Sequence, residues 1–313
     1  MSDSAAPARS KTSIWIQAVR AFAFPATFVS VVVAGALALS YKAGPVNWWL
    51  FPVCMIAGIL YHMAANVISD VFDFKRKVDK DYTFGSSGVL TGGLLTPREA
   101  YLGGLAFFAV ASALGLILVY FRGWPMLAMG VAGLLGAYFY CANPVGYKYI
   151  GLGDFAVFLF FGTGMTIGTF YALTGDLSWA ALAQPVWVSI PLGALIAGIL
   201  SANNVRDIKH DTEAGIITFE SALGISGAKI LYSIWVLGAY LSVPIMAYFG
   251  VIPWWTMVVF LSLPLALKNV KAISGGEVEK PEKIAAVDVA TAQLHTAFGA
   301  LFAISIAVSA FIK

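Results

Sequence analysis

Long, continuous runs of apolar residues dominate the pattern along the chain. A helix needs roughly 20 apolar residues to cross about 30 Å of hydrocarbon. Nine segments meet this requirement: 15–40, 48–72, 99–121, 125–143, 153–174, 184–205, 228–249, 253–272 and 288–311. The runs do not alternate as barrel strands do, and the Gly and Pro residues within them are tolerated in membrane helices. The pattern therefore predicts an all-α polytopic membrane protein with nine transmembrane helices around a central cavity.

Composition and charge support this interpretation. The chain has 313 residues, of which 60% are hydrophobic and 11% charged, whereas a soluble domain carries about 25% charged residues. The net charge of +3 is too small to indicate a nucleic-acid partner. Six tryptophans lie at segment ends, as in an interfacial aromatic belt: Trp48, Trp49, Trp124, Trp179, Trp254 and Trp255.

The basic residues are divided unequally between the two sides of the membrane. With nine spans, one side receives sixteen Lys and Arg residues, Arg20 included, and the other receives only Lys42, Arg122 and Lys313. Because positive charge stays inside, we expect a cytoplasmic N-terminus in a bacterial-type inner membrane. The long polar loops 73–98 and 206–227 then lie on the cytoplasmic face, where we expect the chemistry. Asp176 is the one carboxylate clearly placed outside.

The sequence predicts one membrane domain, 15–313, preceded by a short polar tail, 1–14. The first apolar run is about twice the length of a signal-peptide core, so we expect it to stay as a span. Cys54 and Cys141 lie in apolar stretches and are expected to be small buried side chains rather than a disulfide or metal pair.

Two similar acidic motifs end the second and sixth segments. In the first, 66–81, Asn66, Asp70 and Asp73 share one helix face. In the second, 203–215, the corresponding residues are Asn203, Asp207 and Asp211, with Asn204 on the same side. The motifs lie about 137 residues apart and divide the domain into two pseudo-repeat halves.

Carboxylates at this depth are costly unless they are paired or metal-bound. The plainer interpretations are solvated loop charges or ion pairs with nearby lysines. Facing carboxylates instead favour Mg²⁺, which takes oxygen ligands from a few carboxylates plus substrate phosphates. Zinc is disfavoured because no cysteine or paired histidine accompanies them. We expect catalytic and metal roles for Asp70, Asp73, Asp207 and Asp211.

These motifs resemble those of the UbiA superfamily of intramembrane prenyltransferases. Within it, the chain is most similar to the 1,4-dihydroxy-2-naphthoate prenyltransferases of menaquinone synthesis, over about residues 15–310. Stretches 66–79, 88–97, 149–162 and 203–215 carry the resemblance. The chain departs from that branch at Ser69 and Val71, and at 86–88, where an Arg is common. These positions shape the acceptor end, so they leave the acceptor open.

The resemblance implies a mechanism and further site residues. A polyprenyl diphosphate lies between the two motifs, bridged by Mg²⁺, and ionises; the cation is held against aromatic faces until the aromatic ring attacks it. Family members use a basic residue near the first helix and a Tyr/Lys pair after the fourth. Arg20 and the pair Tyr147 and Lys148 stand there, although a snorkelling arginine or a topology charge would account for them too.

Other residues carry weaker signals. Helical phase turns Arg206 about 100° away from Asp207. We therefore expect Arg206 either to bind substrate or to pair with Glu213. His62 lies one turn before Asn66 and is an acceptor contact in one interpretation. We expect His295 to pack in the last helix; Tyr138 and Tyr140 are more typical of packing. Asp79 and Asp81 orient the first loop or join the metal shell.

Three alternatives remain open from the sequence. The acceptor is 1,4-dihydroxy-2-naphthoate or, in a related enzyme, 4-hydroxybenzoate, homogentisate, chlorophyllide, haem or a glyceryl phosphate. A cation-coupled transporter is a different class, but it predicts charges near mid-helix. A non-catalytic membrane assembly factor would not need both motifs intact. Prenyl length and oligomeric state are not specified.

Overall fold

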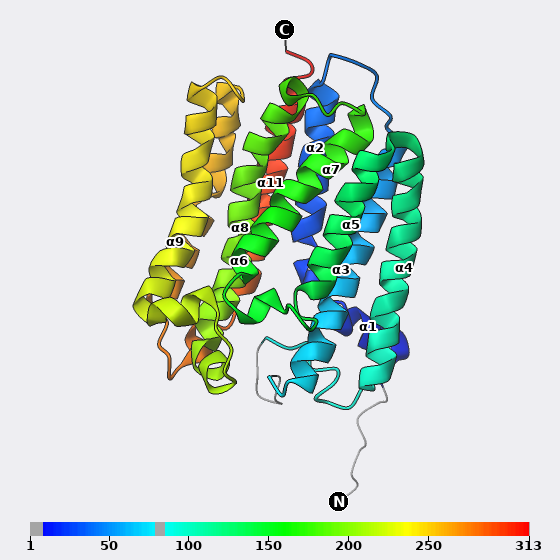
Figure 1. Ribbon diagram of the computed structural model, residues 1–313. Helices are drawn as coiled ribbons and strands as arrows, with labels where there is room; N and C mark the ends of the chain where they lie inside the picture. Colours follow the sequence, from blue (N-terminus) through cyan, green and yellow to red (C-terminus); the bar gives the residue numbers. More distant parts are fainter. Residues whose placement is uncertain (1–8, 79–84, 313) are drawn as a thin grey trace, which may run out of the picture.

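The computed structural model describes residues 9–78 and 85–312, and within them every named element is a helix (Figure 1). Asp79 and Asp81 lie outside it. The helices are α1 (Lys11–Ala18), α2 (Pro25–Ser40), α3 (Leu50–Lys75), α4 (Pro97–Arg122), α5 (Trp124–Phe139), α6 (Gly153–Val157), α7 (Met165–Thr174), α8 (Trp179–Glu213), α9 (Phe219–Tyr248), α10 (Leu263–Ser274) and α11 (Val287–Val308). Short 3₁₀ segments are η1 (Ala21–Ala23), η2 (Tyr147–Tyr149), η4 (Trp254–Ser262) and η5 (Pro281–Ile284), and η3 (Phe158–Gly164) is a π-helix. The predicted all-α class is confirmed.

The helices match the predicted apolar segments in place and composition. Eight helical stretches of the described chain are long and apolar enough to cross a membrane, so the protein is a multi-pass membrane protein. The remaining predicted segment, 125–143, corresponds to α5, an apolar helix of 16 residues that spans only about 24 Å. The nine-span count therefore stays a prediction.

The first segment is not the single continuous helix that we expected over 15–40. α1 ends at Ala18, Arg20 adopts a left-handed conformation with φ 53°, and α2 begins at Pro25. Proline suits the first turn of a helix because its missing N–H has no helical partner there. The break therefore has a local cause, and it places a charged residue between two helices rather than inside one.

The two motif helices are longer than predicted. The hydropathy pattern predicts ends at 72 and 205 for these two segments, but α3 continues to Lys75 and α8 to Glu213. All four motif aspartates therefore project from helix backbone and not from loops. α3 and α8 end at the same end of the bundle, at the bottom of Figure 1, which we call the motif end. The six belt tryptophans lie at starts of elements at the opposite end.

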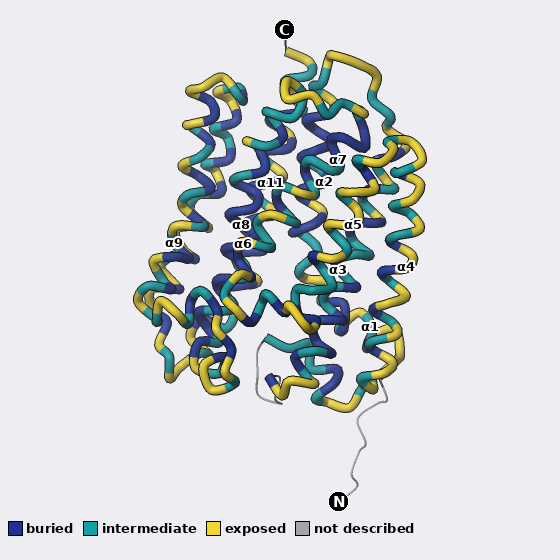
Figure 2. The backbone as a smooth tube through the Cα atoms, in the orientation of Figure 1, coloured by how far each residue is buried: buried dark blue, intermediate teal, exposed yellow. Residues whose placement is uncertain are grey.

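Central and outer helices differ in burial. α8 packs against α9 and α11, α2 against α11, and α3 against α4. Figure 2 shows buried stretches along α2, α8 and α11 and exposed ones along the outer α4 and α9. Gly162 permits a close approach between two backbones: a Cβ there would stand 2.4 Å from Gly193 Cα of α8. The outer faces carry large exposed apolar side chains such as Tyr120, Leu241 and Tyr248, as expected for a lipid-facing surface.

Candidate active site

Both acidic motifs border one cavity of about 760 Å³ at the motif end. Its polar lining combines both halves of the chain: Arg20, His62, Asn66, Ser69, Asp73, Tyr147, Lys148, Asn203, Asn204, Asp207, His210 and Asp211. Its other walls are apolar residues of α3, α4, α5, η3 and α7, including Leu116, Met126, Gly133 and Phe160. The tertiary structure thus joins a charged end to an apolar interior within the bundle.

The first motif is held by cations from two other parts of the chain. Asp70 is 2% exposed and forms an ion pair with Arg20, which the helix break delivers to it. Asp73 is equally buried; its Oδ2 accepts from Lys148 Nζ at 2.7 Å and its Oδ1 from the Tyr149 hydroxyl at 2.6 Å. Arg20 and Lys148, predicted from the resemblance, therefore lie beside the motif.

Lys148 keeps its charge at neutral pH. Burial disfavours the ammonium, but the Asp73 carboxylate at hydrogen-bonding distance outweighs this and raises the pKa of Lys148 well above its usual range. Burial, followed by the charge of Asp73, also raises the pKa of the Tyr149 hydroxyl. Tyr149 therefore acts as a hydrogen-bond donor to Asp73 and Lys148 as a fixed positive charge.

Arg206 corrects the prediction made for the second motif. We expected it to face away from Asp207 or pair with Glu213. It instead donates to both oxygens of Asp207, at 2.9 and 2.8 Å, and to Asp288 of α11 at 3.0 Å. Helical phase describes Cβ directions only, and the long guanidinium reaches back to its neighbour. Arg206 is 4% exposed and supports the motif from behind, outside the cavity lining, so its predicted contact with substrate has no support in this geometry.

The other predicted residues each have their own contacts, separate from the ion pairs of the motifs. Asn66 donates to the Val19 carbonyl at 2.9 Å, and Tyr147 donates to the Gly136 carbonyl. His62 bonds to Thr27 at 3.0 Å and its ring lies near Phe161. His295 is fully buried in α11, in agreement with a packing role. Cys54 and Cys141 are buried and free, as predicted.

Several residues at the site were not singled out as site residues by the sequence analysis. Asp288 orients Arg206, and Asp154 and Glu220 contact Asn204. Each is a single acidic residue with no motif spacing, so only the tertiary fold identifies it. Gly85, from the loop before α4, lies against the second motif: a Cβ there would stand 3.0 Å from Asp207 Oδ2. Tyr140, expected to pack, lines the cavity as well.

The donor set suits Mg²⁺ better than a metal caged by protein alone. The motif side chains offer carboxylate and amide oxygens. No three His, Cys, Asp or Glu side chains converge on one point within the described residues. Mg²⁺ commonly takes one or two carboxylates and completes its shell with water and substrate phosphates. The arrangement fits Mg²⁺ bound together with a phosphorylated substrate.

Comparison with known proteins decides the family. Residues 27–285 match the UbiA prenyltransferase family. The chain belongs to this family. It is a prenyltransferase, and the resemblance noted in the motifs is confirmed.

Relatives and solved structures agree along nearly the whole chain. The 1,4-dihydroxy-2-naphthoate octaprenyltransferase of Bacillus subtilis is 28% identical, covering 95% of this chain and 93% of its own. The enzyme of that name from Mycobacterium tuberculosis is 30% identical over 84% and 86%. A UbiA homologue from Aeropyrum pernix shares the fold with a TM-score of 0.66, 16% identity and coverage of 93% and 98%. A homologue from Archaeoglobus fulgidus, solved with GPP and Mg²⁺, gives a TM-score of 0.53, 16% identity and coverage of 92% and 99%.

Proposed function

We propose that this prenyltransferase moves a polyprenyl group from polyprenyl diphosphate to 1,4-dihydroxy-2-naphthoate, with Mg²⁺, in menaquinone synthesis. The relatives named for that reaction support the acceptor, because each matches most of this chain and most of its own length. The sixteen-to-three division of basic residues supports an inner-membrane enzyme whose motif end faces the cytoplasm.

The observation that carries the proposal is the shape of the cavity. A polyprenyl diphosphate has a highly charged head and a long apolar tail. The cavity has the matching division. The motif aspartates Asp73, Asp207 and Asp211 line one end together with motif asparagines, Arg20 and Lys148, and residues of α4, α5 and α7 line the rest. We infer that the diphosphate lies between the motifs and the tail among these helices.

The residues present divide the chemistry between them. Asp70, Asp73, Asp207 and Asp211 would hold Mg²⁺, which supplies the charge neutralisation that lets a diphosphate leave. Arg20 and Lys148 add fixed positive charge where that group departs.

The aromatic and apolar lining surrounds the place where the prenyl cation would meet the acceptor. Tyr140, Tyr147 and Phe160 border the cavity and present ring faces that stabilise an allylic cation. The apolar walls exclude water, which would otherwise capture that cation. His62, held by Thr27, lies beside this region and is our proposed contact for the acceptor.

The proposal is tested with purified protein in detergent. The protein is incubated with Mg²⁺, one prenyl diphosphate and each acceptor in turn, and products are identified by mass. We expect prenylated 1,4-dihydroxy-2-naphthoate, and none when EDTA replaces Mg²⁺. Product from 4-hydroxybenzoate, homogentisate or a glyceryl phosphate, with none from the naphthoate, overturns the acceptor while keeping the enzyme class.

A further inference from the structure

Two buried carboxyl groups lie beside the second motif, outside the set that the proposed reaction uses. Asp154 is in the first turn of α6 and Glu220 in the first turn of α9. They are 1% and 0% exposed. Neither forms an ion pair with a residue that the structure describes. Burying two carboxyl groups costs free energy that an apolar pair would not, so stability alone does not explain them.

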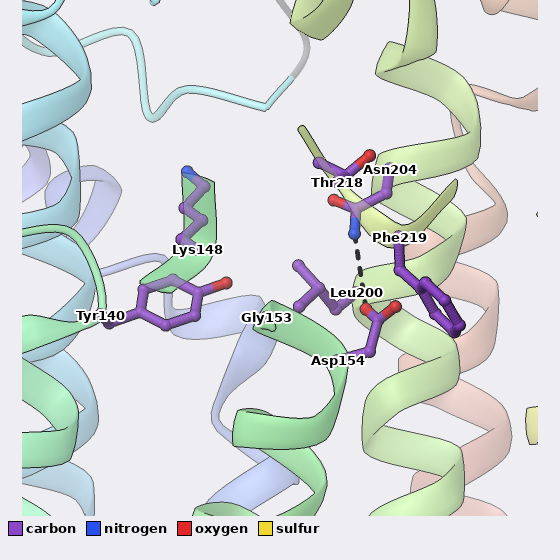
Figure 3. Close-up of a pocket in the computed structure, with 8 residues that line it drawn as sticks. All are labelled: Tyr140, Lys148, Gly153, Asp154, Leu200, Asn204, Thr218 and Phe219. Atoms are coloured by element: carbon purple, nitrogen blue, oxygen red, sulfur yellow. Dashed lines mark hydrogen bonds between the residues drawn. The ribbon is translucent and has the colours of Figure 1, made fainter. Parts of the chain in front are cut away.

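Asn204 of α8 joins the two acids. Its Nδ2 donates to Glu220 Oε2 at 2.8 Å and lies 3.4 Å from Asp154 Oδ1. An amide nitrogen donates and its oxygen only accepts, so both acids select the nitrogen side. The amide oxygen is left on the other side, toward Lys148, as Figure 3 shows.

That orientation places a neutral oxygen on the metal-binding face of α8. Asn204, Asp207 and Asp211 are spaced i, i+3 and i+7, which puts them on one face, and all three line the cavity. The neighbouring Asn203 is engaged differently, because its oxygen accepts from Arg206 Nη2 at 2.8 Å. Of the two adjacent asparagines, Asn204 is therefore the one whose oxygen is not engaged by Arg206.

We propose that Asp154 and Glu220 are positioning residues that hold the Asn204 amide with its oxygen directed at the Mg²⁺ site of the second motif. The inference rests on the proposed function, because it needs Mg²⁺ at this end of the cavity. The two acids come from α6 and α9, so the oxygen is fixed by elements outside the motif helix. Partners of this kind typically change metal affinity by about 10- to 100-fold when removed.

The test measures binding without turnover. Inorganic diphosphate is titrated calorimetrically into detergent-solubilised protein at several Mg²⁺ concentrations. We expect Glu220→Leu to raise the Mg²⁺ concentration needed for half-maximal binding by about 10-fold or more. Glu220→Gln, whose amide oxygen accepts the same bond, is the matched control and should stay close to wild type. If Glu220→Leu does not fold, Asp154→Ala replaces it.

A double-mutant cycle separates positioning from general support. If Glu220 acts through Asn204, Glu220→Leu should add little to the loss already caused by Asn204→Ala. Equal losses with and without Asn204 would overturn the inference, as would equal losses in Glu220→Gln and Glu220→Leu. If wild-type protein shows no Mg²⁺-dependent binding of diphosphate, the proposed function falls first and this inference falls with it.

Discussion

Three of the four motif carboxylates each form an ion pair with an arginine or lysine, and the fourth, Asp211, has His210 Nδ1 at 3.9 Å. Arg20 contacts Asp70, Lys148 contacts Asp73, and Arg206 contacts Asp207. Buried carboxylates without partners would be costly, so these cations stabilise the clustered acids. Arg20 and Lys148 also line the cavity and can turn to diphosphate oxygens, whereas Arg206 stays behind the motif with Asp288.

Removing a motif aspartate should abolish turnover and leave the protein folded. We expect Asp70→Ala and Asp207→Ala to lower kcat by about 100-fold or more, because a metal ion contributes several kcal/mol of charge stabilisation. The measurements are the product assay at saturating Mg²⁺ and thermal unfolding in detergent. Asp176→Ala is the control, since Asp176 bonds to Tyr41 away from the cavity. Near-normal turnover in either motif variant would refute its assignment.

Lys148→Met should weaken use of the diphosphate more than use of the acceptor. A charge-assisted contact contributes about 1.5–3 kcal/mol, or roughly one to two decades in apparent affinity. Steady-state titration of each substrate measures the difference. Lys209→Met is the matched control because Lys209 is on α8 but pairs with the exposed Glu279. An unchanged KM for the diphosphate together with an unchanged kcat would remove Lys148 from the site.

At the scale of elements, the site depends on departures from regular helices. The break between α1 and α2 presents Arg20 to the site, and η2 presents Lys148 and Tyr149. The bend of α9 at Gly224, where φ is 66°, separates the turn that carries Glu220 from the rest of the helix. The π-helix η3 packs on α8, where Gly162 meets Gly193. Each irregularity brings a side chain or backbone to a position that a straight span would not reach.

The contact of η3 with α8 should tolerate no added methyl group. In Gly162→Ala the new Cβ meets α8 backbone, which cannot move aside as a side chain can. Overpacking of this kind costs about 1–3 kcal/mol, so we expect a lower Tm in detergent. Gly238→Ala is the control, because no atom lies within 4 Å of a Cβ at Gly238 of α9. Equal Tm values for the two variants would contradict the packing argument.

At the scale of the whole molecule, the two ends of the bundle differ in chemistry. Acidic motifs and most basic residues gather at the motif end, and the belt tryptophans at the other. The cavity runs from the motif end into the apolar interior. The bundle therefore has one charged end, where the cavity begins, and one end rich in tryptophan.

We expect the motif end to face the cytoplasm. Single cysteines are introduced as Glu213→Cys and Asp176→Cys in protein whose Cys54 and Cys141 have been replaced by Ala. An impermeant thiol reagent added to intact cells should label the Asp176 position and spare the Glu213 position until the membrane is opened. The reverse labelling pattern would invert the topology.

The apolar part of the cavity should limit prenyl length. Gly133 of α5 lines the cavity and has no atom within 4 Å of a built Cβ. Gly133→Leu should therefore fill space used by the tail, reducing transfer from long donors while sparing geranyl diphosphate. Relative rates with a series of donor lengths measure this effect, and Gly238→Leu, outside the cavity, is the control. An unchanged donor preference would place the tail elsewhere.

The sequence by itself determined the solvent and the class, and it predicted the acidic groups that we propose to bind the metal. Continuous apolar segments specify membrane helices because lipid leaves the backbone no other partners. The repeated Asn–Asp spacing identified Asp70, Asp73, Asp207 and Asp211 because helical periodicity converts spacing into a shared face. The charge distribution likewise needed no structure to predict an orientation.

Only the tertiary structure decided which groups support the second motif. Arg206 turned back to Asp207 because Asp288, from a helix about 80 residues later, faces it from the other side. Asp154 and Glu220 became partners of Asn204 through the packing of α6 and α9 on α8. Contacts between distant elements leave no periodicity in the chain, so spacing rules cannot find them. The sequence did not reveal the break at Arg20 or the short length of α5 for a related reason. Hydropathy indicates whether a segment lies in lipid or in water, and it does not indicate the backbone conformation of that segment.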